Sequence, residues 1–336
     1  MSGVSSSRLL VVLATFVALG LVASVLIGPA GFAFGQALTD VAAGRESTNA
    51  IVLLEIRLPR ALLAVIVGAA LGMTGAAMQG LLRNPLAEPG VTGIAACAAF
   101  GAVVAFYFGL SGRLAVGLPL AGIAGAACGA VALVAITGRD ASVATLILVG
   151  AALNALAGAA TALVLGLSPN PYAFYEIGLW LMGGFTDRGL DHVALAAPCV
   201  LAGGIALWMA RRGLDALALG EETARGLGED PTRTGWLVVA GGALAVGGAV
   251  AVAGVVGFVG LMAPHAVRPF VRHRPGASLL PSAFAGAILA LLADIAVRVL
   301  PSGRELPLGV MTALIGAPVL IRIAWQARRS GSATWL

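Results

Sequence analysis

The stretch ALLAVIVGAALGMTGAAMQGLL, residues 61–82, contains no charged side chain. A helix needs about 20 consecutive apolar residues to cross the hydrocarbon core of a bilayer. The four glycines in the stretch allow the backbones of neighbouring helices to approach closely. The stretch therefore predicts a transmembrane helix that packs against other helices.

The same pattern recurs along the chain and predicts an all-α, polytopic membrane protein. We expect one transmembrane domain over residues 1–336, in which the N-terminal run is a retained span because it is long for a signal-peptide core. The run from residue 234 to 264 is too long for one span and is interrupted by glycines, so it is divided into two helices. The ten predicted spans are Leu9–Gly28, Ala61–Leu82, Val91–Tyr107, Leu114–Gly138, Ser142–Gly166, Val193–Ala210, Thr234–Gly254, Gly257–Phe270, Pro275–Arg298 and Leu306–Trp325.

The composition excludes several classes of protein. Hydrophobic residues make up 60% of the chain and charged residues 10%, against about 25% charged in soluble domains. A soluble enzyme, a disordered chain and a nucleic-acid binder are excluded. The net charge of +5 is typical of membrane proteins with excess Arg on cytoplasmic loops.

All twenty basic residues are Arg, and the chain has no Lys. A phosphate-binding P-loop needs its Lys, so this chain is predicted to be no ATP-hydrolysing enzyme. The three Cys and three His show no metal-ligand spacing. We expect no catalytic residue, no metal site and no permanently bound cofactor.

The distribution of Arg predicts the topology. With ten spans and a cytoplasmic N-terminus, thirteen Arg lie inside and seven outside. If the short helix at residues 257–270 does not cross, nine lie inside and eleven outside. The positive-inside rule favours ten spans with both termini in the cytoplasm.

Two segments flank the second span. Arg57 and Arg60 surround a Pro at its start, and their position alone favours a membrane anchor over a docking point for an acidic partner. The segment Arg83–Gly90 contains two Pro, which forbid a continuous helix. It is either a rigid turn or a constriction at the inner mouth.

Two further segments point to function. The piece Tyr175–Phe185 follows Ser168–Pro171 and is too short to cross, so we expect a half-helix at the outer face beside a substrate path. Residues 211–233 form the longest cytoplasmic connection, predicted as two short helices broken at Gly220. Leu217, Ala224 and Leu227 would give it an apolar face for a partner.

Ionisable residues are scarce inside the spans. The exception is Asp294 and Arg298, which stand four residues apart and predict an ion pair. The absence of a chain of acids argues against a proton-coupled secondary transporter, which is kept as a remote alternative.

These segments together resemble the permease family of ATP-driven (ABC, type II) importers for haem, iron-siderophores and cobalamin. The resemblance covers the chain from about Ile51 to its end. It rests on IRLPRALLAVIVGAALGMTGAAMQGLLRNPLAEPG (Ile56–Gly90), LWLMGGF (Leu179–Phe185), ALGEETARGLG (Ala218–Gly228), GFVGLMAPHAVR (Gly257–Arg268), LLADIAVR (Leu291–Arg298) and ELPLGVMTALIGAPVLI (Glu305–Ile321).

The resemblance implies partners in the lipid bilayer of the bacterial inner membrane. It implies a homodimer of twenty helices, two cytoplasmic ATPase subunits that use ATP, a periplasmic binding protein and no nucleic acid. It implies binding-protein docking at Arg57, Arg60 and Arg298, in place of the anchor reading. It also implies an inner gate at Asn84, Leu86, Ser142 and Val143, and coupling to the ATPase through Leu217, Gly220, Glu221, Glu222, Ala224, Arg225, Leu227 and Gly228.

For the substrate we expect haem, ahead of ferric siderophores and then cobalamin. The SPNP stretch and the Asp187-Arg188 pair resemble haem members more than cobalamin members. Haem carries two propionates, and the Arg188 guanidinium offers a bidentate match to a carboxylate. The alternative is that Arg188 pairs with Asp187 or Asp191 and contacts no substrate.

Overall fold

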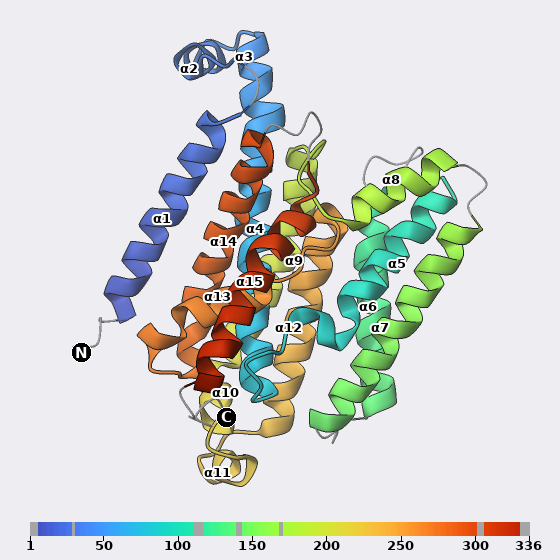
Figure 1. Cartoon of the computed structure of the whole chain (residues 1–336), viewed down its shortest axis with the longest axis vertical. Helices are drawn as coiled ribbons and strands as arrows, with labels where there is room; N and C mark the ends of the chain where they lie inside the picture. The colour runs from blue at the N-terminus through green and yellow to red at the C-terminus, as the bar shows by residue number, and fades with distance from the viewer. Residues whose placement is uncertain are drawn as a thin grey trace.

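The computed structural model describes residues 6–28, 31–109, 117–138, 143–167, 171–300 and 306–329, and every regular element in these ranges is helical (Figure 1). Each predicted span coincides with a helix. These ten helices are α1 (Ser6–Leu26), α4 (Leu58–Leu81), α5 (Ile94–Tyr107), α6 (Gly117–Thr137), α7 (Val143–Gly166), α9 (Leu190–Met209), α12 (Pro231–Ala253), α13 (Val259–Val267), α14 (Pro275–Val299) and α15 (Leu308–Arg329).

Shorter helices lie between them. The upper end of the molecule in Figure 1 carries α2 and α3, and the lower end carries α10 and α11. The five shorter helices are α2 (Phe34–Ala42), α3 (Thr48–Ile51), α8 (Pro171–Leu181), α10 (Arg211–Leu217) and α11 (Glu221–Gly226). A π-helical turn at Val52–Arg57 joins α3 to α4.

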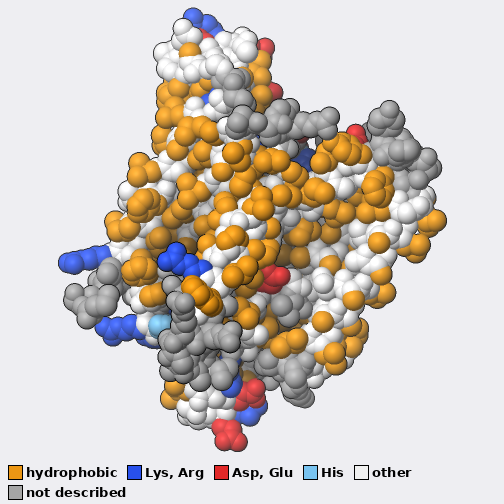
Figure 2. Space-filling model, in the orientation of Figure 1, with side chains coloured by type: hydrophobic (Ala, Val, Ile, Leu, Met, Phe, Trp, Pro, Cys, Tyr) orange, Lys and Arg blue, Asp and Glu red, His pale blue; other side chains and the backbone are white. Residues whose placement is uncertain are grey.

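Seven of the described helical segments are long and apolar enough to cross a membrane. Helices α5 and α15 provide shorter apolar stretches, and α13 has only nine residues. The all-α membrane fold is therefore confirmed, and the number of ten crossings stays a prediction. Figure 2 shows hydrophobic side chains over most of the visible helices, with charged side chains mainly in the lower half and at the upper tip.

The centre of the bundle is formed by α4, α12 and α14. Helix α4 packs against α14 so closely that a Cβ atom on Gly68 would meet the backbone carbonyl of Gly286. One turn further along, a Cβ on Gly72 would meet the carbonyl of Ser282. Only glycine permits this backbone contact. The close approach predicted at Gly68 and Gly72 is confirmed.

The segment between α12 and α14 returns the chain to the end at which α12 began. Helix α12 ends at Ala253, and the non-helical residues Gly254–Phe258 lead into α13. Gly254 and Phe258 both have left-handed backbone, with φ of 69° and 67°. The helix predicted at Gly257–Phe270 is shorter than expected, because Phe258 delays its start to Val259 and a 3₁₀ turn replaces its end from Arg268.

Contacts at the lower end show the return directly. Asp215, which follows α9 in α10, accepts a bond from the backbone N–H of Gly276 at 2.9 Å. Its other oxygen lies 2.6 Å from the guanidinium of Arg274. The starts of α12 and α14 therefore lie at the same end, as the predicted topology requires.

Three chain segments meet where α12 ends. The N–H of Gly184 donates to the carbonyl of Ala253 at 2.8 Å, and the N–H of Leu308 donates to the carbonyl of Gly183 at 2.9 Å. The half-helix predicted at Tyr175–Phe185 corresponds to α8, which ends earlier because Gly183 has φ of 76°. These bonds satisfy backbone groups that apolar surroundings would leave without partners.

Candidate functional site

Four charged side chains form a cluster at the upper end. Arg60 Nε donates to Asp294 Oδ1 at 2.8 Å, and Arg298 Nη2 lies 3.0 Å from Asp294 Oδ2. Asp294 is 1% exposed, and Arg57 and Arg60 are also buried. The ion pair predicted between Asp294 and Arg298 is confirmed, and Arg60 is a second partner that the spacing did not indicate.

The same arginines hold the end of α1. Arg57 Nη1 donates to the carbonyls of Val25 and Leu26, each at 2.8 Å. Arg298 Nη1 donates to the carbonyls of Ser24 and Ile27 at 2.9 and 2.8 Å. The last carbonyls of a helix have no partner within it, and the helix dipole makes this end attractive to cations. Both guanidinium groups therefore act as a C-terminal cap on α1.

The structure thus brings Arg57, Arg60 and Arg298 together, as the docking prediction requires. It also buries Arg57 and Arg60 and leaves the Arg298 side chain only 4% exposed. Their donors are directed to Asp294 and to α1. Their docking role stays a prediction. What the sequence did not reveal is the capping of α1, because backbone carbonyls accept these bonds and every residue type carries one.

The loop at residues 211–233, which is predicted to couple to an ATPase and is called the coupling loop below, projects from the lower end (Figure 1). It contains two short helices separated at Gly220, whose φ is 111°; this confirms the predicted break. Glu221, Glu222 and Arg225 are exposed on α11.

Only part of the apolar face predicted for this loop is exposed, because the rest packs into the core of this chain. Leu217 and Ala224 are buried against the rest of the chain, with Ala224 at 0% exposure, so they do not face a partner. Leu227 is 63% exposed, and Leu219, which the prediction missed, is 66% exposed. Periodicity identified an apolar face but did not show that this chain's own core takes part of it.

The predicted inner gate is described only in part. Ser142 lies outside the described residues, and Val143 begins α7. Asn84 Oδ1 accepts from the N–H of Leu86 at 2.9 Å, which fixes the turn after α4, and the Leu86 side chain is 66% exposed. Burial raises the pKa of the Glu88 carboxyl in the same segment.

Arg188 lies at the end of α12 rather than on a free surface. Its Nε donates to the carbonyl of Val252 at 2.8 Å. Burial lowers the pKa of its guanidinium, and the nearby charges of Asp187 and Asp191 oppose that shift. The sequence analysis expected Arg188 to contact either the substrate or a nearby Asp, and it did not include the carbonyl of Val252 as a partner.

Most of the chain fits a known family. The sequence model of the FecCD transport family matches residues 15–326. The chain belongs to the FecCD transport family. The resemblance to importer permeases is therefore confirmed.

Similar proteins of known sequence are named as permease proteins of transporters or import systems. An uncharacterized ABC transporter permease protein, YvrB of Bacillus subtilis, is 40% identical over 83% of this chain and 80% of its own length. The cobalamin import system permease protein of Halobacterium salinarum is 38% identical over 83% of this chain and 74% of its own. The vitamin B12 import system permease protein of Escherichia coli O9:H4 is 37% identical over 82% and 84%.

A solved structure agrees with this grouping. It is an inward-facing conformation of a transporter assigned to the metal-chelate type of ABC transporters. It superposes with a TM-score of 0.83 and 30% sequence identity, covering 96% of this chain and 99% of that chain. The FecCD chain described here is accordingly a permease subunit of an ABC importer.

Proposed function

We propose that this chain works as a homodimer, with two ATPase subunits on the coupling loop and a binding protein at the upper end, in the bacterial inner membrane. The observation that carries the proposal is the coupling loop, because it places charged side chains and two exposed leucines at the lower end of the bundle. In this arrangement the chain performs no covalent chemistry, and its partners bind and hydrolyse ATP.

The contacts of α10 supply a route for coupling. Asp215 joins α10 to the start of α14 through Arg274 and the N–H of Gly276. Helix α14 is in backbone contact with α4 at Gly68. A displacement of the loop by ATP binding in the partner would move α10, α14 and α4 together. Two permease copies would then alternate between outward- and inward-open states by a rearrangement of packed helices.

For the substrate we propose a large metal chelate, with cobalamin as the first candidate and haem as the second. Two of the relatives above are named as cobalamin or vitamin B12 import permeases. The physical argument for haem relied on Arg188, and the Nε of Arg188 is engaged by the carbonyl of Val252. Haem and ferric siderophores therefore stay predictions, and haem is supported by the resemblance of the SPNP stretch and of the Asp187-Arg188 pair.

The test is reconstitution of the permease with its ATPase and binding protein in vesicles. Uptake is measured for cobalamin, haem and a ferric siderophore. We expect ATP-dependent uptake of one class, and we expect none in vesicles that lack the ATPase. Uptake that is driven by a proton gradient without the ATPase would overturn the importer assignment, and ATP-dependent uptake of the siderophore alone would overturn both substrate candidates.

We propose that the binding protein docks at the upper arginine cluster. Because these arginines are already bonded within the chain, docking requires competition for them. Carboxylates of the binding protein would have to compete with Asp294 and with the carbonyls of α1 for Arg57, Arg60 and Arg298. Docking should then weaken as salt screens charges over about 8–10 Å. The check is the association rate of Arg298→Glu, with Arg45→Glu on an exposed surface as the matched control.

A further inference from the structure

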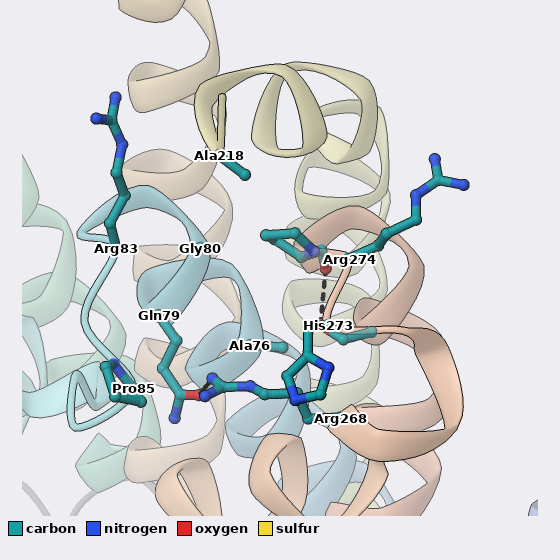
Figure 3. A pocket seen from close by; sticks show the side chains of 11 residues that line it. Ala76, Gln79, Gly80, Arg83, Pro85, Ala218, Arg268, His273 and Arg274 are labelled. Carbon is teal, nitrogen blue, oxygen red and sulfur yellow. Dashed lines mark hydrogen bonds between the residues drawn. The ribbon is translucent and has the colours of Figure 1, made fainter. Parts of the chain in front are cut away.

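A pocket of about 270 Å³ lies at the lower end, where α4 ends and α14 begins (Figure 3). It is distinct from the exposed face of α11, although Ala218 contributes to its wall. Figure 3 shows Gln79 and Arg268 meeting at one side of the pocket, with Gly80 behind it. Its polar lining consists of Gln79, Arg83, Arg268, His273, Arg274 and Ser278.

The lining carries an excess of positive charge. Arg274 is paired with Asp215, which is not part of the lining. Arg268 is half-buried, and its Nη2 donates to the neutral Gln79 Oε1 at 2.5 Å. Within the described part of the chain, no carboxylate forms an ion pair with Arg83 or Arg268. Arg268 therefore lines the pocket without an anion to balance its charge, whereas the exposed guanidinium of Arg83 extends away from Arg268 (Figure 3).

The backbone at the pocket is held in an unfavourable conformation. Arg83 and His273 have φ of 48° and 59°, in the left-handed region that residues with a Cβ atom rarely occupy. Arg83 follows the end of α4, where the N–H of Asn84 donates to the carbonyl of Gln79, and glycine is the usual residue at such a position. Strain of this kind is concentrated at functional sites. Glycine would adopt these two backbone conformations more easily, yet the chain has Arg83 and His273 there.

We propose that this pocket binds a phosphate group, presented either by an anionic phospholipid headgroup or by free phosphate. A guanidinium group offers parallel donors that match phosphate oxygens. The amide of Gln79 orients Arg268 without neutralising it. The pocket lies between two apolar helices at the end where Arg is concentrated, and basic pockets in this position bind lipid phosphates in other membrane proteins.

A carboxylate of the ATPase is a less favoured ligand. Gln79 is two residues before the end of α4, whereas α10 and α11 extend further beyond that end (Figure 1). A protein that docks on the exposed face of α11 would have to reach past both helices. Gln79 is close to the end of an apolar span, Thr48–Leu81, where lipid headgroups are expected.

The first experiment compares the wild type, Arg268→Gln and Arg212→Gln in detergent. Arg212 is exposed on α10 and does not line the pocket, so its variant removes the same charge elsewhere. Inorganic phosphate is titrated against chloride at equal ionic strength, with the thermal unfolding midpoint and calorimetric heat as readouts. We expect the dissociation constant for phosphate to rise about tenfold or more in Arg268→Gln and to stay unchanged in Arg212→Gln.

A second arm distinguishes the source of the phosphate. The three proteins are placed in nanodiscs of phosphatidylcholine with or without phosphatidylglycerol, and retained lipids are counted by native mass spectrometry. Retention of phosphatidylglycerol that is lost only in Arg268→Gln identifies the headgroup as the source. Phosphate binding that is lost only in Arg268→Gln, without preferential lipid retention, identifies free phosphate.

Gln79→Glu keeps the proposal testable if Arg268→Gln does not fold. This variant places a carboxylate beside Arg268, so it should abolish phosphate binding while the fold stays intact. Equal binding in wild type and in both pocket variants would overturn the proposal, as would no binding of phosphate or phosphatidylglycerol by the wild type. A loss of ATPase association in Arg268→Gln, with phosphate and lipid binding unchanged, would assign the pocket to a partner carboxylate instead.

Discussion

The two ends of the molecule use charged residues in opposite ways. At the upper end, Arg57 and Arg60 are buried and the Arg298 side chain is 4% exposed. These arginines bond to Asp294 and to the carbonyls of α1. At the lower end, the charges of α11 are exposed, and the ion pair of Arg225 with Glu221 is long, at 3.8 Å. Residues of the same chemical type therefore stabilise the bundle at one end and remain available to a partner at the other.

The difference teaches that charge alone does not identify an interface. A buried charge is costly unless paired and hydrogen-bonded, so the upper arginines must be judged first by what they do inside the chain. An exposed charge contributes little to stability, so the charges on α11 are free to serve binding.

The largest expected effect is at Asp294. Asp294→Asn removes the carboxylate shared by Arg60 and Arg298 and leaves two buried guanidinium groups without it. We expect the free energy of unfolding to fall by about 3–5 kcal/mol, measured by chemical denaturation in detergent. Asp40→Asn is the control, because its partner Arg45 is exposed and the pair should contribute about 1 kcal/mol or less. A similar small effect at Asp294 would remove the contrast between the two ends.

The cap on α1 should give the next largest effect. Arg298→Gln loses the bonds to Ser24 and Ile27 and should favour local opening at the end of α1 by about 2 kcal/mol. Hydrogen exchange of the amides in the last turn of α1 would report this as faster exchange. The amides of α12 serve as the internal reference. Unchanged exchange in α1 would mean that packing alone holds this helix.

At the lower end, we expect substitutions to weaken binding of the ATPase and to leave the free energy of unfolding almost unchanged. Replacing Glu221 and Glu222 together with Arg should weaken ATPase association about tenfold, because exposed interface charges set the encounter and its register. The free energy of unfolding should change by less than about 0.5 kcal/mol, as for other surface positions. Unaltered ATPase association and stimulation in this variant would argue against the coupling assignment.

The smallest expected effect is at Arg225. Its pair with Glu221 joins residues four apart on an exposed helix, so Arg225→Ala should cost about 0.5 kcal/mol or less in unfolding. The measurement is the same chemical denaturation as for Asp294→Asn, which allows direct comparison. A loss of several kcal/mol at Arg225 would show that the lower end is also held together by its charges.

The sequence predicted the positions of the helices well because each long apolar run has a simple physical cause. It missed α2, α3 and the π-helical turn, since residues 34–57 mix apolar and polar side chains without a clear pattern. It also missed the pairing of Arg60 with Asp294, 234 positions apart. The burial of Leu217 and Ala224 could not be inferred from spacing, because spacing identifies a face but not its neighbour.

The short helix α13 has a consequence for how the protein is made. Nine residues rise only about 14 Å, half of the bilayer core of about 30 Å. The non-helical residues Gly254–Phe258 before it expose backbone groups that lipid cannot satisfy. This segment cannot partition into the membrane alone, as a long apolar helix can. Helix α13 packs against α4 and α14. Its stable insertion must therefore wait until α14, which follows it in the chain, has been made.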